Sequence, residues 1–390
     1  MIQNARIVKR HFIEDGTILL EDGVIRAVDR GSAEITDPEI SVIDAGGLYV
    51  APGFIELHTH GAGGADFMDG TPGCILQAAK THMEHGVTSL VPTTLTSTME
   101  DLFSTIDHFK IAKDQMENGP ELLGLHLEGP YFSMAQKGAQ DPRYLKDPNP
   151  EEYRKIIAYA GGTIIRWSVA PELPGAIEMG DYLVKHGILP SIAHTDAEYY
   201  HVLEAFRHGY THVTHLYSGM STITRKSGFR HLGVIESSYA IEDLTVEIIA
   251  DGCHLPIELL QMIYRAKGAD KICLISDSMR CAGQDTAKSI LGSLQNGQEV
   301  IIEDGVAKQP DRSAFASSIA TDDRLVRVMH REAGIHLCDC IAMMSATPAK
   351  VMGISHRKGS IEPGKDADLV IFDDQINLSK VICKGTVTKS

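Results

Sequence analysis

The chain has 390 residues, of which 43% are hydrophobic and 23% are charged, a composition typical of a globular protein with one large domain and a smaller one. Its 36 Lys and Arg against 52 Asp and Glu give a formal net charge of −16, which argues against nucleic acid and anionic membrane surfaces as partners. No apolar run has the length of a signal peptide or approaches the roughly 18 residues of a membrane span. Seven scattered cysteines without zinc-finger spacing favour reduced thiols and a cytoplasmic location.

The first 50 residues contain short segments separated by Gly and Asp-Gly, which is typical of β-strands joined by tight turns. Eight apolar or β-branched runs then follow, and each predicts a strand: 49–57, 88–94, 122–128, 163–170, 187–194, 211–217, 245–251 and 271–277. Apolar residues at three- and four-residue spacing predict helices between most of these strands, at 74–85, 99–118, 150–160, 175–187, 196–209 and 256–268.

Eight alternations of strand and helix predict a parallel (β/α)8 barrel, with an open doubly wound sheet as the structural competitor. A hairpin over 297–309 and two helical segments, 321–335 and 338–353, follow the eighth strand. Residues 359–390 have the same strand-and-turn texture as the N-terminus. We therefore expect both termini, 1–53 and 354–390, to form a small β-sandwich domain, with the catalytic barrel over 54–353 inserted between them.

Metal-ligating side chains occur where the predicted strands end. His58 and His60 stand in the segment Gly53-Phe-Ile-Glu-Leu-His-Thr-His-Gly61, and their i, i+2 spacing places both on one face of a strand. The other candidates are Glu128, His194, His215 and Asp277. Because the carboxyl ends of barrel strands meet at one mouth, these six groups predict a site for a divalent metal such as Zn²⁺ or Fe²⁺.

Most of the 18 histidines are expected to have no role of this kind. His85 precedes Gly86 and is typical of a helix C-terminus. His126 shares a face with Glu128, so it either supports the site or is a core residue. The glycines at 61, 63 and 64 predict a sharp turn after the His pair and room for a substrate.

Eight segments of the sequence together resemble one enzyme family. They are APGFIELHTHG, GVTSLVPTT, LHLEGPYFS with KGA, AHTDA, THLYSGM, ADGCHLP, ISDSMR and GSIEPGKDADLVIFD. The sequence is similar in these segments to the N-acetylglucosamine-6-phosphate deacetylases of the amidohydrolase superfamily, over essentially the whole chain. This resemblance implies a metal-dependent barrel with a small β domain, an amino-sugar phosphate as substrate and a homodimer.

The resemblance also implies roles for individual residues. Glu128, His194 and His215 would hold the central metal, and His58 and His60 would complete a second site bridged by Glu128. Asp277 would act as general base and then general acid, besides lying among the metal ligands. The residues implied in substrate binding are His254 at the acetyl oxygen, Arg230 at the phosphate, and Ala139, Ser218, Gly219, Phe315, Ala316 and Ser317.

Three departures from the family pattern leave the specificity open. Ser218-Gly219 stands where the family usually has Asn-Ala, the loop before Arg230 is longer, and Ala193 replaces a glycine. An N-acetylgalactosamine-6-phosphate deacetylase is therefore an alternative. A cyclic amidohydrolase or N-acyl-D-amino-acid deacylase would more often have a bridging Lys, and a non-catalytic binding protein would lack some of the ligands.

Overall fold

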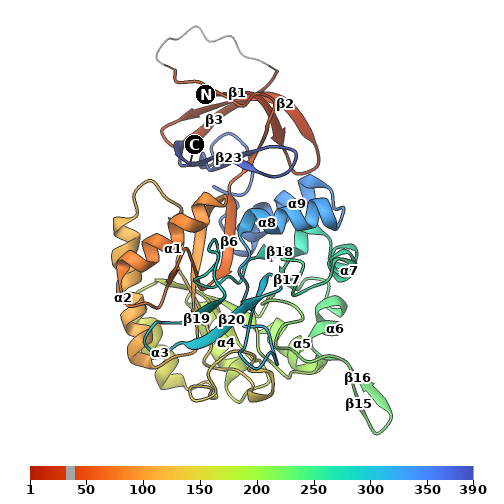
Figure 1. Cartoon of the computed structure of the whole chain (residues 1–390). Helices are drawn as coiled ribbons and strands as arrows, with labels where there is room; N and C mark the ends of the chain where they lie inside the picture. Colours follow the sequence, from red (N-terminus) through yellow and green to blue (C-terminus); the bar gives the residue numbers. More distant parts are fainter. Residues whose placement is uncertain (32–39, 390) are drawn as a thin grey trace.

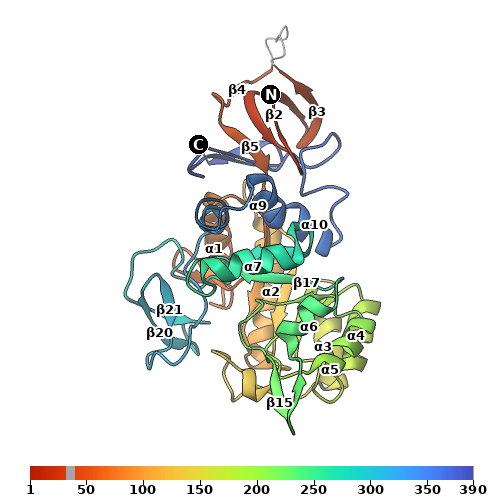
Figure 2. The same cartoon turned by 90° about the vertical axis from the view of Figure 1, so that its right-hand side faces the viewer.

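A computed structural model describes residues 1–31 and 40–389. Residues 32–39 and Ser390 fall within the predicted terminal ranges and lie outside the described residues. The described chain has two parts, a large barrel and a sheet made from both termini, which lies above the barrel in Figures 1 and 2. Among these residues, no helix is both long and apolar enough to cross a bilayer.

The parallel barrel predicted from the sequence is confirmed. Its strands are β6 (Phe54–Thr59), β9 (Val87–Thr94), β11 (Leu125–Glu128), β12 (Ile164–Val169), β13 (Leu189–Ile192), β14 (His212–Val213), β17 (Thr245–Ile249) and β18 (Ile272–Ile275). Each pairs in parallel with the next, from β6 to β18, and the short β10 (Glu121–Leu122) adds to β9.

The seam between β6 and β18 is closed by individual hydrogen bonds rather than by a regular ladder. The Asp277 N–H donates to the His58 carbonyl at 2.9 Å, and the His60 N–H donates to the Ser278 carbonyl at 2.8 Å. The buried Glu56 carboxylate accepts from the N–H groups of His58 and Ser276, both at 2.8 Å. These bonds hold the ends of the first and last strands together, directly beside the predicted metal ligands.

Helices surround the barrel strands (Figure 1). They are α1 (Pro72–Glu84), α2 (Met99–Gln115), α3 (Pro150–Ala160), α4 (Ala176–Lys185), α5 (Tyr199–Arg207), α6 (Val234–Ala240) and α7 (Ile257–Lys267), with single turns η1 (Met134–Gln136) and η2 (Ala269–Lys271). Side-chain caps fix several starts: Thr71, Thr98 and Asn149 each accept a backbone N–H of the helix that follows. Their apolar faces pack on the strands in one large core.

Both termini form one hydrogen-bonded sheet, in the order β24-β23-β22-β5-β1-β2-β3, with β4 beside β1. Its strands are β1 (Ile2–Val8), β2 (Ile13–Glu21), β3 (Val24–Arg30), β4 (Ile43–Asp44), β5 (Tyr49–Pro52), β22 (Leu369–Phe372), β23 (Leu378–Cys383) and β24 (Thr386–Lys389). Ile7, Val50, Leu369 and Ile371 belong to its apolar core. Residues more than 300 positions apart therefore share one core.

An ionic cluster joins the terminal segment to the barrel. Arg357 contacts Glu121 at 2.7 Å and Asp366 at 2.8 Å. The buried Lys358 ammonium lies 3.1 Å from Glu121 and 2.9 Å from Asp366, and it also contacts Asp368. Because Glu121 belongs to barrel strand β10, this cluster links the two parts through charge as well as packing.

Four details differ from the sequence prediction or add to it. The run 49–57 was expected to form one strand, which is wrong: β5 lies in the terminal sheet and β6 in the barrel, with Gly53 between them. The segment 338–353 is two helices, α9 (Leu337–Met344) and α10 (Ala346–Val351), which meet at Ser345. The segment 321–335 contains α8 (Asp322–Arg327) and then a π-helical turn, η3 (Val328–Glu332). The predicted hairpin, β20 (Gln298–Glu303) and β21 (Val306–Lys308), gains a third strand, β19 (Lys288–Leu291).

Two small hairpins follow barrel strands. The glycines after the His pair form β7 (Gly61–Ala62) and β8 (Ala65–Asp66), joined by Gly63 and Gly64 with φ of 60° and 90°, a turn that needs glycine. The second hairpin, β15 (Thr224–Lys226) and β16 (Phe229–His231), projects from the barrel body in both views (Figures 1 and 2).

Candidate metal centre

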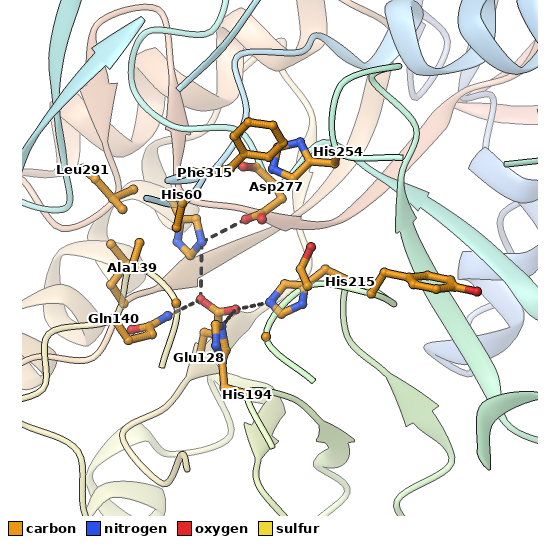
Figure 3. Close-up of a pocket in the computed structure, with 17 residues that line it drawn as sticks. His60, Glu128, Ala139, Gln140, His194, His215, His254, Asp277, Leu291 and Phe315 are labelled. Carbon is orange, nitrogen blue, oxygen red and sulfur yellow. Dashed lines mark hydrogen bonds and ion pairs between the residues drawn. The ribbon is translucent and has the colours of Figure 1, made fainter. Parts of the chain in front are cut away.

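The six predicted ligands come from the carboxyl ends of five barrel strands and converge on one point; Figure 3 shows all of them except His58. His58 lies within β6 and His60 directly follows it, while Glu128 is the last residue of β11. His194, His215 and Asp277 each lie two residues beyond the ends of β13, β14 and β18. The convergence follows from the barrel, because parallel strands all end at the same mouth.

Glu128 lies at the middle of the cluster. Its Oε1 is 3.0 Å from the Nε2 of His215 and 3.4 Å from the Nε2 atoms of His58 and His194. Its Oε2 is 3.5 Å from the Nε2 of His60. One carboxylate thus faces four imidazoles: its Oε1 faces His58, His194 and His215, and its Oε2 faces His60.

Asp277 completes the His58–His60 side of the cluster. Its Oδ1 is 3.2 Å from the Nε2 of His60 and 3.4 Å from that of His58. The donor atoms therefore fall into two groups that each lie within 4.8 Å of one another, His58–His60–Asp277 and Glu128–His194–His215. Imidazole nitrogens and carboxylate oxygens in groups of three are a typical set for Zn²⁺ or Fe²⁺, and Glu128 lies where it could bridge two ions.

The donor set fits a cation for a second reason. The Nε2 of His58 is buried and has no hydrogen-bond partner among the described residues, although it points at Glu128 and Asp277. A buried polar atom without a partner costs free energy unless a ligand satisfies it. A divalent ion among these oxygens and nitrogens would satisfy it.

The charges of the cluster also favour a cation. Burial raises the pKa of Glu128, but the imidazoles of His58, His194 and His215 outweigh burial and hold that pKa well below its usual range. Burial lowers the pKa of His60, yet the carboxylates of Asp277 and Glu128 raise it to about 9. The site therefore holds two ionised carboxylates away from bulk water, which attract positive charge.

Three ligands have backbone conformations that are uncommon for residues with a side chain. The φ angles are 43° at His194, 27° at His215 and 46° at Asp277. Such left-handed conformations cost about 1–3 kcal/mol each and persist where surrounding structure enforces them, which is common at functional sites. Here the conformation lets each side chain turn into the mouth just after its strand ends.

Other polar groups hold the ligands in place. Gln140 donates from Nε2 to Glu128 Oε2 at 2.7 Å, and its Oε1 accepts the Thr96 N–H at 3.0 Å, which fixes the orientation of the amide. The Nδ1 of His194 lies 2.8 Å from the Gln136 carbonyl, and that of His60 lies 3.3 Å from the Thr93 carbonyl. Carbonyl partners set the tautomer that leaves Nε2 facing the cluster.

His126 is a supporting core residue and not a member of either donor group. Its Nε2 bonds to Ser168 at 2.7 Å, its Nδ1 to Thr93 at 3.2 Å, and its ring packs against His58 with centroids 4.7 Å apart. Burial, with Arg166 nearby, holds its pKa well below its usual range. A neutral imidazole therefore lies directly beneath the site.

A cavity of about 270 Å³ opens over the cluster. Its lining includes five of the ligands and six of the predicted substrate residues: His60, Glu128, His194, His215 and Asp277, with Ala139, Ser218, Gly219, His254, Phe315 and Ser317. Figure 3 shows His254 and Phe315 on the same side as Asp277. The His254 Nδ1 is 2.8 Å from Asp251, and its ring lies 4.9 Å from that of Phe315, so the imidazole is held at the cavity wall.

Gly219 allows its loop to lie against a ligand. Its φ is +59°, and a Cβ added there would come within 2.7 Å of the His194 Nδ1 and 3.0 Å of the Gln136 carbonyl. The glycine at position 219 therefore permits close packing on His194.

The structure places two predicted substrate residues away from the cavity lining. Ala316 is 1% exposed and packs in a core cluster with Met279 and Leu291, and its N–H donates to the Ala307 carbonyl at 2.9 Å. Arg230 lies on the exposed hairpin strand β16, where its guanidinium bonds to the Gly228 carbonyl at 3.1 Å. Among the described residues that line the cavity there is no Lys or Arg.

Several residues of the site were not predicted from the sequence. Gln140 lines the cavity and contacts Glu128, and the only available signal was its position just after the Lys-Gly-Ala motif. Arg166 and Glu247 lie fully buried beneath the cluster. A charged residue in the middle of an otherwise apolar strand, as in Thr-Val-Glu-Ile-Ile, was the signal for Glu247.

The chain is similar to known proteins over nearly its whole length. A model of the Amidohydrolase family matches residues 49–388. The N-acetylglucosamine-6-phosphate deacetylase of Bacillus subtilis (strain 168) is 32% identical, covering 98% of this chain and 95% of the relative. The N-acetylgalactosamine-6-phosphate deacetylase of Escherichia coli O157:H7 is 28% identical, covering 97% and 96%.

Solved structures agree as well. The crystal structure of N-acetylglucosamine-6-phosphate deacetylase from Pasteurella multocida has a TM-score of 0.91 and 27% identity, and the match covers 100% of this chain and 99% of that one. A mutant of the Mycobacterium smegmatis deacetylase in complex with N-acetyl-D-glucosamine-6-phosphate has a TM-score of 0.90 and 26% identity, with the same coverage.

Proposed function

This chain belongs to the amidohydrolase family, and we propose that it hydrolyses the acetamide of an N-acetylated amino-sugar 6-phosphate. Water adds its oxygen to the acetyl carbon, the C–N bond breaks, and acetate and the free amine leave. The substrate that we propose first is N-acetylglucosamine-6-phosphate, which would give glucosamine-6-phosphate. The observation that carries the proposal is the placing of Glu128 and Asp277 among four imidazole Nε2 atoms, at distances of 3.0–3.5 Å, at the base of a cavity.

The family is metal-dependent, and we propose that one or two Zn²⁺ or Fe²⁺ ions are held by His58, His60, Glu128, His194, His215 and Asp277. Such an ion, when bound, acts as a Lewis acid and makes water acidic enough to be a nucleophile near neutral pH. The remaining steps belong to the protein's own side chains.

Asp277 is the proposed proton carrier. Its carboxylate lines the cavity, and burial, which raises its pKa, is outweighed by His58 and His60, which keep the pKa below its usual range. An ionised carboxylate can accept the proton of the attacking water and then give it to the departing nitrogen, which turns a poor leaving group into an amine.

His254 is the proposed partner of the acetyl oxygen. Because its Nδ1 is engaged by Asp251, its Nε2 is the atom left to face a substrate. Since the Asp251 carboxylate accepts from Nδ1, donation from Nε2 requires the imidazolium form of His254, which has a proton on each ring nitrogen. In that form the Nε2–H would stabilise the negative charge that develops on the carbonyl oxygen. Phe315 packs against its ring and covers part of the cavity wall.

A substrate phosphate is typically bound by Arg or Lys side chains. Among the described residues of a single chain, the cavity lining contains neither. We propose that Arg230 still binds the phosphate, and that the β15–β16 hairpin delivers this residue to the site of a second copy in a homodimer. The hairpin projects from the barrel and carries Arg225, Lys226 and Phe229. Phe229 is 76% exposed. An exposed aromatic side chain among cations is typical of an interface hot spot.

This part of the proposal predicts a specific defect. We expect Arg230→Ala to raise KM for the phosphorylated substrate far more than for the same sugar without phosphate. Mixing Arg230→Ala with Asp277→Asn should then restore turnover, because a mixed dimer has one site with both groups. Equal KM changes for both sugars, or no recovery on mixing, would reject Arg230 as a contact made between copies.

The galactosamine epimer is a second candidate, favoured by the similarity to the Escherichia coli N-acetylgalactosamine-6-phosphate deacetylase and by Ser218-Gly219. A cyclic amidohydrolase or N-acyl-D-amino-acid deacylase is less favoured, because Glu128 occupies the bridging position where a Lys would be expected. We also propose a cytoplasmic location, which scattered free thiols favour.

The test is amine release from N-acetylglucosamine-6-phosphate, N-acetylgalactosamine-6-phosphate and an N-acetyl-D-amino acid. We expect one of the two sugar phosphates to be turned over fastest. Preference for the amino acid would replace the proposed substrate class.

A further inference from the structure

We propose that Glu247 is a positioning residue that holds the imidazole of His58 in the orientation needed to bind metal, acting from beneath the site. This inference rests on the proposed metal centre and adds to it a residue that touches neither substrate nor metal. It is carried by the contacts of Glu247 in the barrel interior.

Glu247 lies in the middle of β17, and its side chain is completely buried. Its Oε2 is 3.3 Å from the Nδ1 of His58 and 3.4 Å from the N–H of His215. One carboxylate oxygen therefore faces a ligand ring from the first barrel strand and the backbone of a ligand that follows the sixth.

The contact with Glu247 determines which nitrogen of His58 is free. An ionised carboxylate only accepts hydrogen bonds, so the proton of the imidazole stays on Nδ1. The lone pair is then on Nε2, the atom that faces Glu128 and Asp277 at 3.4 Å and has no other partner in the part of the chain that the structure describes. Metal-ligating histidines are commonly held by a carboxylate in this manner, which also makes the imidazole a stronger ligand.

His58 differs in this respect from two neighbouring ligands. The Nδ1 atoms of His60 and His194 face the backbone carbonyls of Thr93 and Gln136. A carbonyl fixes orientation but carries no full charge, whereas the Glu247 carboxylate does both. Of these three histidines, His58 is therefore the one whose strength as a ligand depends on a charged side chain at Nδ1.

Glu247 in turn has a fixed counter-ion. Arg166 from β12 contacts its Oε1 and also donates to Ser191 Oγ at 3.0 Å, Thr214 Oγ1 at 2.8 Å and the Leu57 carbonyl at 3.2 Å. His212 approaches the same Oε1 at 3.2 Å. The guanidinium is thus held by Leu57 of β6, Ser191 of β13 and Thr214 just after β14, and it fixes the carboxylate that faces His58.

Stability does not explain this ion pair. Barrel interiors are usually filled with Val, Ile and Leu, and replacing a buried ion pair by apolar residues of similar volume is often neutral or stabilising. Removing two charges from water costs free energy. We therefore attribute the presence of this ion pair to its role at His58.

The decisive experiment uses the double variant Arg166→Met/Glu247→Leu, which replaces both charges with apolar side chains. Chelator-treated wild-type and variant proteins are titrated with Zn²⁺ by calorimetry, and their thermal midpoints are recorded. We expect the variant to match or exceed the wild-type Tm while one Zn²⁺-binding step weakens about 10- to 100-fold. Unchanged zinc affinity in every step would overturn the inference.

Ser168→Ala is the matched control. Ser168 is buried in the same polar layer, and its hydroxyl bonds to His126 and Thr214. Its backbone pairs with that of Glu128 between β11 and β12, and the change to Ala leaves this backbone pairing in place. This variant should bind zinc like the wild type. A loss of affinity equal to that of the double variant would mean that any disturbance of the layer suffices, and would overturn a specific role for Glu247.

Glu247→Gln decides the question if the double variant loses Tm. This change keeps the shape and removes the charge, so we expect weaker zinc binding and a lower kcat at saturating substrate with KM little changed. Zinc affinity equal to that of the wild type would overturn the inference. Absence of zinc uptake by the wild-type protein itself would instead remove the proposed function, and this inference with it.

Discussion

The core of the terminal sheet and the layer of the barrel beneath its mouth are both built from buried strands, yet they are filled with opposite kinds of side chain. Ile7, Val50 and Ile371 fill the sheet, and each is at most 1% exposed. Beneath the barrel mouth the equally buried positions are taken by His58, Arg166, Glu247 and other polar groups.

This contrast separates two tasks. Burying apolar side chains stabilises a fold by roughly 25 cal/mol per Å², whereas burying charges costs free energy that other contacts must offset. We conclude that the terminal sheet and the outer layer of the barrel stabilise the fold. The polar layer lowers this stability in part, and its contacts hold the ligands in place. Substitutions in the two regions should therefore have opposite signatures.

The largest effect is expected in the polar region, at Asp277. Replacement by Asn keeps the size of the side chain but removes the group that carries the proton, so kcat should fall about 10²- to 10⁴-fold. The thermal midpoint should change little, since Asn can still bond to His60. Steady-state kinetics and thermal unfolding of the same preparation check both; a kcat within threefold of wild type would remove Asp277 from this role.

The opposite signature is expected in the terminal sheet. Ile371→Ala leaves a cavity in its core and should lower the free energy of unfolding by about 2–5 kcal/mol, measured by denaturant titration. The kcat/KM of the folded enzyme should stay at the wild-type value, because this residue belongs to a separate cluster from the site. A large fall in kcat/KM at full folding would show that the two regions are coupled.

A smaller, pH-dependent effect is expected at the junction between the regions. Burial raises the pKa of Glu121, but Arg357 and Lys358 outweigh it and lower that pKa to about 2, below the ordinary 4.5. A carboxyl whose pKa is lower in the folded state stabilises the fold above pH 4.5, and this contribution is lost as the pH falls from 4.5 to 2.

Glu121→Gln should therefore destabilise the protein by on the order of 1–3 kcal/mol at pH 7. The variant should also lose stability less steeply than wild type between pH 4.5 and 2. Denaturant titrations at several pH values measure both, and parallel pH curves for the two proteins would contradict the account.

Much of the architecture was predictable because its signals are local. Strand and helix periods can be read in short windows, and the i, i+2 spacing of His58 and His60 sets their common face. The rule that barrel strands end at one mouth then brings Glu128, His194, His215 and Asp277 to the same point.

Features that depend on long-range packing were not predictable. Apart from Glu56, the run 49–57 has no charged residue, and its pattern does not indicate that the chain passes from one sheet to the other at Gly53. The Ser227-Gly228 turn, with φ of 47° and 91°, is a hairpin signal, but the flanking strands are only three residues long. That this hairpin holds Arg230 away from the cavity depends on its direction in space, which spacing does not encode.

The most direct test of the central claim, that imidazoles and carboxylates from five strands act through a bound cation, is turnover before and after removal of metal. Amine release from N-acetylglucosamine-6-phosphate should fall to background once elemental analysis shows that chelation has left the protein free of metal, and should return when Zn²⁺ or Fe²⁺ is added back. Full turnover by the metal-free protein would contradict the account.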